Sequence, residues 1–418
     1  MFITRSEEGP LLDELYHDAQ KLLSARVTSI FYYVTCVLQV AYGVLGTSYL
    51  FSFLDGTIFN DVLVGRIVVL AVVVCELGVL ANKGYERRDA YALLALIVMG
   101  TGPLSRMSTP MLYPALLIFC GRSFDVRRTV TVCTCALATA VTAVMICGGI
   151  GIVDDTVFVT SWRIRHCLGF TFCLFPSMYL FMITCCVCYL RDEALTLVEG
   201  VLLLVANVLM FVLTRSETSF GLPVLLMVAI FVQRLPVVKR LNLGWFWKML
   251  SWSMLIAFVM SVILTLLYGV LHDTGLGWLD GLNAATRGRF SYAYEGIKEF
   301  GVTALGQYVP WQGAGLSPYG YNPHIAKYNY VDNMFMHVLL EQGWIYVLGY
   351  VALCTGVTRK AFREQEYMTL LVMGVMAAYC IFNDLTMYLH YNLLLFLISG
   401  LYVRTSHNGN VLSRAEES

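Results

Sequence analysis

The chain has 418 residues, with 28 basic and 28 acidic side chains and a formal net charge of zero. Hydrophobic residues make up 58%, only 13% are charged, and the mean hydropathy is +0.69. Soluble domains carry about 25% charged residues, so this composition excludes an ordinary soluble fold. It indicates an α-helical membrane protein with several crossings, and the neutral balance gives no sign of a nucleic-acid partner.

In chain order, the polar residues 1–26 come first, and Pro10 followed by leucines predicts a short amphipathic helix on the membrane surface. Hydropathy then predicts an all-α fold of about twelve transmembrane helices, nine within residues 27–270 and three within residues 331–404. Between them lies one large loop, residues 271–330, and a polar tail follows at 405–418. The predicted spans are 27–53, 61–81, 90–105, 109–121, 129–153, 167–190, 194–213, 218–234, 245–270, 331–357, 367–385 and 389–404. A re-entrant pair is an alternative for the short spans 90–105 and 109–121.

The predicted loops alternate in their content of Lys and Arg. The set that is rich in these residues is expected in the cytoplasm together with both termini, which places the large loop outside. Five outer arginines are not explained by this rule: Arg163, Arg165, Arg215, Arg287 and Arg289. A cation kept there needs a partner that offsets its cost. That partner is either a ligand or, as the alternative, lipid headgroups reached by snorkelling side chains.

Charged and aromatic residues gather in the large loop and just after it. They include Arg287, Arg289, Trp311, His324, Lys327, Tyr328, Tyr330 and Asp332. Guanidinium groups bind phosphate oxygens, and aromatic rings either stack on sugars or form an interfacial belt. The region therefore suits a ligand that is part anionic phosphate and part sugar.

Four short motifs occur in a fixed order on this topology. They are Arg163 and Arg165 before Leu168-Gly169-Phe170, Thr214-Arg215-Ser216 at a span end, Gly288-Arg289 in the loop, and Asp332-Asn333 opening the next span. Together they resemble the Wzy-type polysaccharide repeat-unit polymerases, which are relatives of the O-antigen ligases. The resemblance covers roughly residue 163 to the end of the chain. Ligases typically have a His-Asn pair where this chain has Asp332-Asn333, which favours a polymerase.

This resemblance implies a GT-C-type membrane fold and a metal-independent glycosyltransferase. Such an enzyme joins oligosaccharide units carried on undecaprenyl pyrophosphate into O-antigen or capsule polysaccharide, on the outer side of the bacterial cytoplasmic membrane. It implies no nucleotide sugar, metal or other cofactor. The implied partners are the lipid-linked oligosaccharide, membrane lipid, a chain-length regulator and a flippase.

The leaving group of that reaction is a lipid pyrophosphate, whose negative charge grows as the glycosidic bond breaks. We expect Arg165, Arg215 and Arg289 to form a clamp that stabilises this charge. Further candidates for binding the substrate are Arg163, Arg287, Lys327, His324, Tyr328, Tyr330, Trp311 and Asp384.

Asp332 is the candidate base for the acceptor hydroxyl, because a carboxylate beside aromatic residues can have its pKa raised by desolvation. As an alternative, Asp332 or Asn333 caps the helix that follows, and His324 is a competing base. Asp384, near the outer end of its span, is expected to orient a clamp arginine.

Two other functions stay open from the sequence. One is a ligase that transfers finished glycan to another acceptor. The other is a transporter or flippase of lipid-linked sugars, although transporters tend to carry repeats and broken helices at the midplane. The 13 cysteines all lie in or beside apolar runs, and we predict that they are packing residues.

Overall fold

The fold is described from a computed structural model, which covers residues 23–54, 60–82, 84–160, 163–241, 243–272, 277–313, 316–317, 320–321 and 328–402. This part of the chain is mostly helical. Five helices are long and apolar enough to cross a membrane: Ala25–Leu45, Asp61–Ala81, Val126–Gly149, Leu197–Thr214 and Ser253–Leu271. The prediction of a helical membrane protein is confirmed, and the number of twelve crossings stays a prediction. The predicted N-terminal surface helix and the tail at 405–418 lie outside the described residues.

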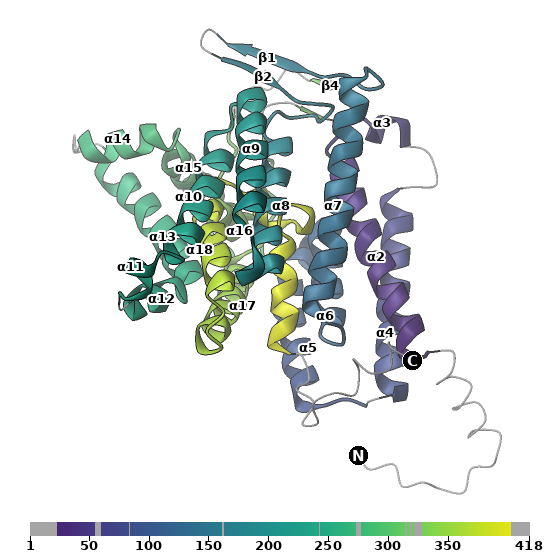
Figure 1. Ribbon diagram of the computed structural model, residues 1–418. Helices are drawn as coiled ribbons and strands as arrows, with labels where there is room; N and C mark the ends of the chain where they lie inside the picture. The colour runs from purple at the N-terminus through teal and green to yellow at the C-terminus, as the bar shows by residue number, and fades with distance from the viewer. Residues whose placement is uncertain are drawn as a thin grey trace, which may run out of the picture.

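The first part of the chain forms a bundle of helices that join at alternating ends (Figure 1). Its elements are α2 (Ala25–Leu45), α3 (Phe51–Leu54), α4 (Asp61–Asn82), α5 (Arg87–Arg106), α6 (Thr109–Gly121) and α7 (Val126–Gly149). Helix α2 packs against α4 and α7. At one end, Arg122 donates to Asp89 Oδ1 and to both carboxylate oxygens of Glu76, at 2.7–2.8 Å. A buried guanidinium is stable only with such partners, so this ion cluster ties α4, α5 and the α6–α7 turn together.

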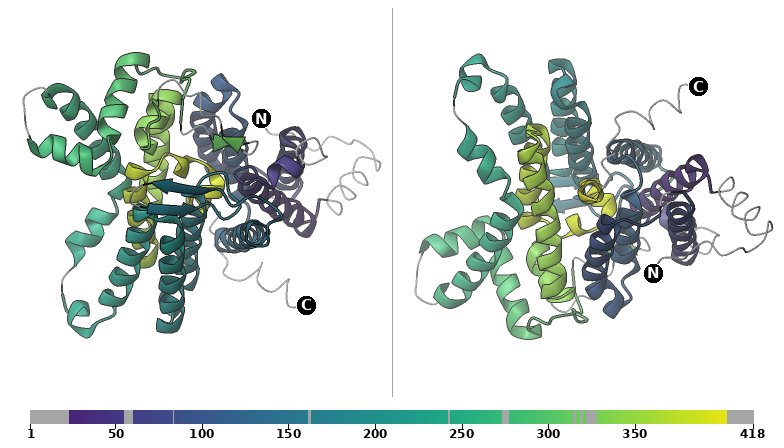
Figure 2. Two further views of the ribbon diagram at one scale, coloured as in Figure 1. Left: turned by 90° about the horizontal axis from the view of Figure 1, so that it is seen from above. Right: turned by 90° about the horizontal axis from the view of Figure 1, so that it is seen from below.

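The second part adds a hairpin and three long helices. The hairpin consists of β1 (Val157–Thr160) and β2 (Arg163–His166), and it precedes α8 (Phe175–Arg191), η1 (Asp192–Ala194), α9 (Leu197–Thr214) and α10 (Glu217–Gln233). Seen from above, the hairpin crosses the middle of the molecule (Figure 2). Alternate strand residues share a face, so Arg163 and Arg165 point to one side while Ile164 is exposed.

The predicted large loop is folded rather than irregular. After α11 (Pro236–Lys239), α12 (Gly244–Leu250) and α13 (Ser253–Leu271), it contains α14 (Gly277–Ala285), α15 (Arg289–Phe300), β3 (Leu316–Ser317) and β4 (Gly320–Tyr321). Ala293 and Val309 of this region form a small core with Val331, Met336 and Leu340. The predicted span 245–270 also begins as two helices, because the chain turns at Ser251 and Trp252 between α12 and α13.

The last part differs most from the predicted spans. It contains α16 (Met334–Glu341), α17 (Trp344–Arg363), α18 (Tyr367–Phe382) and three 3₁₀ segments, η3 (Leu385–Met387), η4 (Leu389–Tyr391) and η5 (Leu393–Leu401). The span predicted at 331–357 contains two helices instead of one, because the helix is broken at Gln342 and Gly343. Gly343 has a φ of +88°, and a Cβ there would lie 2.4 Å from the backbone nitrogen of Gly306. The span predicted at 389–404 starts in irregular 3₁₀ turns instead of an α-helix.

The outer arginines of the sequence analysis lie at one end of the bundle. The β1–β2 hairpin, the α9–α10 junction and α14–α15 are at the upper end in Figure 1, whereas α6–α7 and α8–α9 join at the lower end. The two predicted sets of loops are therefore separated in space. Which end faces the cytoplasm stays a prediction.

Gly343→Ala should destabilise the protein by about 1–3 kcal/mol, because a side chain at this φ and ψ is strained and its Cβ would clash with Gly306. The measurement is the melting temperature of the detergent-solubilised protein. Gly281→Ala in α14 is the matched control, since a Cβ there meets no atom within 4 Å. Equal melting temperatures for the two variants would contradict the close approach at residue 343.

Candidate functional site

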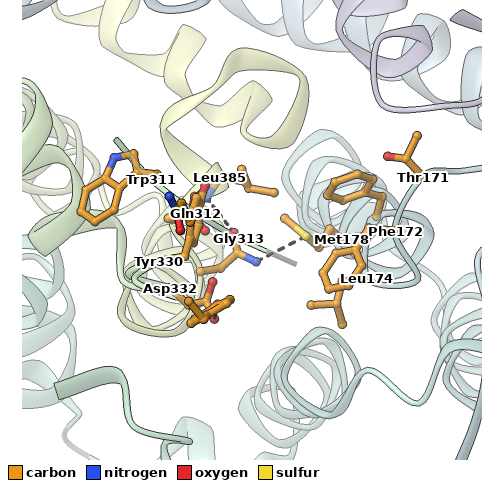
Figure 3. A pocket seen from close by; sticks show the side chains of 14 residues that line it. Thr171, Phe172, Leu174, Met178, Trp311, Gln312, Gly313, Tyr330, Asp332 and Leu385 are labelled. Carbon is orange, nitrogen blue, oxygen red and sulfur yellow. Dashed lines mark hydrogen bonds between the residues drawn. The ribbon is translucent and has the colours of Figure 1, made fainter. Parts of the chain in front are cut away.

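A cavity of about 500 Å³ lies where three distant parts of the chain meet. Its lining comes from the segment before and at the start of α8, from the loop preceding α16, and from the turn after α18. Figure 3 shows Phe172, Leu174 and Met178 on one side, facing Trp311, Tyr330 and Asp332 on the other. Aromatic and apolar groups thus surround a small number of polar atoms, which is the usual composition of a ligand site.

Two carboxylates line this cavity, Asp332 and Asp384. Asp384 is 3% exposed and accepts a hydrogen bond from Tyr330 Oη at 2.6 Å. Tyr328 Oη donates to Asp332 Oδ2 at 3.4 Å. Burial raises the pKa of Asp332 above its ordinary value, and Arg289, Tyr328 and His337 partly offset this effect. A carboxylate in such a site can accept the proton of a substrate hydroxyl.

The helix cap and the candidate base are different residues. Asn333 is the N-cap of α16, where its side-chain oxygen accepts from the backbone nitrogen of Met336 at 3.2 Å. Its side-chain nitrogen donates to Ser261 Oγ of α13 at 3.1 Å. Asp332 therefore does not cap α16, and its carboxylate faces the cavity.

Arg289 lies at the edge of this cavity, at the start of α15. Its Nε donates to the backbone oxygen of Asp332 at 3.0 Å, and one terminal nitrogen donates to Thr286 O at 2.7 Å. Burial lowers the pKa of Arg289, while the charges of Asp332 and Asp384 act in the opposite direction. Asp384 was expected to orient an arginine of the clamp. Its charge acts on Arg289, but the hydrogen bond of its carboxylate is with Tyr330.

The other predicted arginines form a neighbouring group around the hairpin. Arg165 is buried, and its Nε donates to the backbone oxygen of Thr214 at 2.8 Å, directly before Arg215. Arg215 is exposed and ends α9 with a φ of +50°. Arg287 pairs with Glu217 of α10 at 2.8 Å.

Arg163 connects this group to the loop. Burial lowers the pKa of Arg163, and the positive charges of Arg165 and Arg287 lower it further. The left-handed turn at Arg287 and Gly288 then leads to Arg289. The charge of Arg287 thus acts on both Arg163 and Arg289, and Arg289 donates a hydrogen bond to Asp332, which lines the cavity.

Five predicted binding or catalytic residues line the cavity itself: Trp311, Tyr328, Tyr330, Asp332 and Asp384. His324 and Lys327 lie outside the described residues. Sequence reasoning missed Asn383, whose side-chain nitrogen contacts Met178 Sδ at 3.3 Å across the cavity. Its position next to Asp384, at the end of an apolar run, was the feature of the sequence that could have identified Asn383 as a candidate.

A buried charge network behind the cavity was also missed. His337 of α16 stacks on Trp311 with ring centroids 4.6 Å apart, and its Nε2 lies 3.2 Å from Glu341 Oε2. Glu341 in turn pairs with Arg106 of α5 at 2.9 Å. The i,i+4 spacing of His337 and Glu341 was visible in the sequence, but the partner on α5 was not.

No protein-family model, curated protein or solved structure matches this chain. Among the residues that the structure describes, no three His, Cys, Asp or Glu side chains are grouped so as to hold a metal ion.

Asn333→Ala should lower the free energy of unfolding by about 2 kcal/mol, because it loses the N-cap bond and also the buried hydrogen bond to Ser261. Asp332→Asn should not lower it, because the amide removes a buried charge and leaves the cap intact. Thermal unfolding of the two purified variants checks this difference. If Asp332→Asn is destabilised as much as Asn333→Ala, the assignment of the cap is wrong.

Proposed function

We propose that the protein polymerises oligosaccharide repeat units that are linked to undecaprenyl pyrophosphate, on the outer side of a bacterial cytoplasmic membrane. The observation that carries the proposal is the contact of Arg289 with the backbone of Asp332 at the edge of an aromatic-lined cavity. This contact brings together the Arg289 guanidinium, which can stabilise a leaving phosphate, and Asp332, whose carboxylate can accept the proton of an attacking hydroxyl. The order of the sequence motifs along the chain supports the same function.

In the proposed reaction, a hydroxyl oxygen of the acceptor sugar attacks the anomeric carbon of the donor glycan. The carbon–oxygen bond to the lipid pyrophosphate breaks, and its electron pair leaves with the pyrophosphate. The proton of the acceptor hydroxyl goes to the Asp332 carboxylate. Arg289, at hydrogen-bond distance from the Asp332 backbone, stabilises the charge that develops on the leaving oxygen.

The surroundings of Asp332 suit this role. Tyr328 and Arg289 hold the acid in place by hydrogen bonds at 3.4 and 3.0 Å, the second to its backbone. Trp311 and Tyr330 line the same cavity, and aromatic rings of this kind stack on pyranose sugars. The positive charges of Arg287 and Arg289 act on each other beside Asp332, and together they attract an anionic lipid headgroup.

One observation favours the transporter alternative. Residues 383–392 break the helical run between α18 and η5, and they contribute to the cavity lining. Broken helices at binding sites are common in secondary transporters. Purified protein that moves labelled lipid-linked units across a vesicle membrane without forming longer glycan would establish that function instead.

Arg289→Ala should lower the rate of polymerisation by about 10²–10³-fold, the usual loss when one donor to a developing oxyanion is removed. The measurement is the glycan ladder that purified protein forms from lipid-linked repeat units. Arg240→Ala is the control, because Arg240 is an exposed cation in the turn after α11, away from the cavity lining. A normal ladder from a folded Arg289→Ala variant would refute the role of Arg289.

The polymerisation rate should fall as the pH drops through the pKa of Asp332, because only the carboxylate accepts a proton. Burial places this pKa above the ordinary value of about 3.9. The charged and titratable groups near it are Arg289 of α15, Tyr328, His337 of α16 and Asp384 of the turn after α18. A pH–rate profile measures the effect, and the residual activity of Asp332→Asn should lack this acid limb. If the variant keeps the limb, another group is the base.

A further inference from the structure

Two cysteines lie beside each other in the short segment between the β1–β2 hairpin and α8. Cys167 directly follows β2, and Cys173 shortly precedes Phe175, the first residue of α8. Both are free thiols in the structure, with 0% and 1% of their surface exposed. The Cys167 thiol donates a hydrogen bond to the Cys173 sulfur, so the two sulfur atoms are close neighbours.

A tight turn of the backbone brings the two cysteines together. Leu168 and Gly169 have φ values of +54° and +84°, and the backbone nitrogen of Phe170 donates to the oxygen of Cys167 at 3.0 Å. Positive φ at both central residues is the pattern of a type I′ turn, which reverses the direction of the chain. The reversal allows Cys173, further along the segment, to reach Cys167.

Two arginines of the hairpin act on this pair. The positive charges of Arg165 and Arg163 both act on the Cys173 sulfur. Nearby cations stabilise a thiolate, and the thiolate is the form of cysteine that attacks a disulfide. The pair therefore combines two adjacent thiols with the electropositive surroundings that are typical of cysteines that undergo thiol–disulfide exchange.

Two other pairs of thiols also interact directly, Cys36 with Cys133 and Cys75 with Cys120. Three of these four residues lie on α2, α4 and α7, which are long and apolar enough to cross a membrane, and the fourth lies on the shorter apolar helix α6. The pair beside the hairpin lies outside all of these helices, at the upper end of the molecule in Figure 1. Its position thus distinguishes it from the thiols that pack between apolar helices.

We propose that Cys167 and Cys173 form a disulfide bond that closes the segment before α8. The inference does not depend on the proposed function. It depends on the predicted orientation, which places the hairpin end outside the cytoplasm, where disulfides form and persist. It gives these two cysteines a covalent role, whereas the sequence predicted that all 13 are packing residues.

The bond would fix one wall of the candidate site. Thr171 and Phe172 lie between the two cysteines in the chain, and both line the cavity of about 500 Å³. Leu174, which follows Cys173, lines the same wall (Figure 3). A covalent link between residues 167 and 173 restricts the conformations of the segment that carries these side chains.

The oxidant in this step is itself a disulfide, carried by a protein or a small molecule of the outer compartment. The Cys173 thiolate attacks one sulfur of this donor, and the other donor sulfur leaves as a thiolate. The Cys167 thiolate then attacks the Cys173 sulfur of the mixed disulfide and displaces the remaining donor sulfur. The two thiol protons go to the two donor sulfurs, so the donor is reduced to a dithiol while the protein loses two electrons. Because both sulfurs are buried in the folded protein, the exchange takes place before the segment packs.

The test is made on the full-length protein in the cells that produce it. Acid quenching of intact cells stops thiol exchange, and alkylation in detergent then blocks every free thiol. Chymotrypsin cuts after Phe170 and Phe172, so the peptides that contain Cys167 and Cys173 stay joined only through a disulfide. We expect mass spectrometry to find the joined peptides, two hydrogens lighter than the sum of the two reduced peptides.

Variants identify the partners of the bond. Cys147→Ala is the matched control, because Cys147 lies near the C-terminal end of α7, which precedes the hairpin. It should leave the joined peptides in place, whereas Cys167→Ala should leave Cys173 alkylated. Alkylation of both Cys167 and Cys173 in the unmodified protein would overturn the inference, and so would a disulfide from either of them to a different cysteine. None of these measurements uses the polymerisation assay, so failure of the proposed function would not change their result.

Discussion

The buried pair of Arg106 and Glu341 holds the folded loop against the bundle, and the cavity depends on it. Their side chains are 13% and 14% exposed, and they meet at 2.9 Å. Arg106 also donates to the backbone oxygen of Gln307, and Glu341 also contacts His337. One guanidinium therefore connects α5, the loop and α16. Removing one partner of a buried pair typically costs about 3–5 kcal/mol, so these three elements cannot separate easily.

From this pair, a series of contacts fixes the groups that line the cavity. His337 stacks on Trp311, and the ring of Tyr330 packs at the edge of Trp311. Tyr330 then donates to Asp384. Gly343 also packs closely against Gly306 and Ala304 of the loop, where a Cβ would lie 2.4–2.5 Å from backbone atoms. The acids thus owe their positions to packing around the α16–α17 break, which lies one helix away from them.

Sequence patterns predicted the structure correctly where interactions between residues close in the chain determine it. Apolar runs predicted the helices, and the short spans 90–105 and 109–121 correspond to α5 and α6. Pro110 does not interrupt α6, because it lies in the first turn, where the missing N–H would have no helical partner. The breaks at 342–343 and 383–392 were missed because contacts between distant segments impose them. The candidate site was anticipated in its aromatic and acidic residues. Its arrangement was not, since Arg165 of the hairpin donates to Thr214 beside Arg215, whereas Arg289 contacts Asp332 of the cavity.

The interruption between α18 and η5 has a physical consequence for the cavity described above and for a neighbouring cavity of about 360 Å³, which shares Phe175 and Leu385 with it. Irregular backbone at the depth of a membrane is tolerated only where protein or a cavity satisfies its polar groups. Here Asn383 accepts from the backbone nitrogen of Leu385 at 2.9 Å, and Asn392 donates to the backbone oxygen of Thr386 at 3.1 Å. These amides free the turn from helical geometry, so that Asp384 faces one cavity and His390 the other. In a continuous α-helix, Asp384 and His390 would lie on different turns of the same helix. With the 3₁₀ turns η3 and η4 in place of a helix, Asp384 lines one cavity and His390 lines the other.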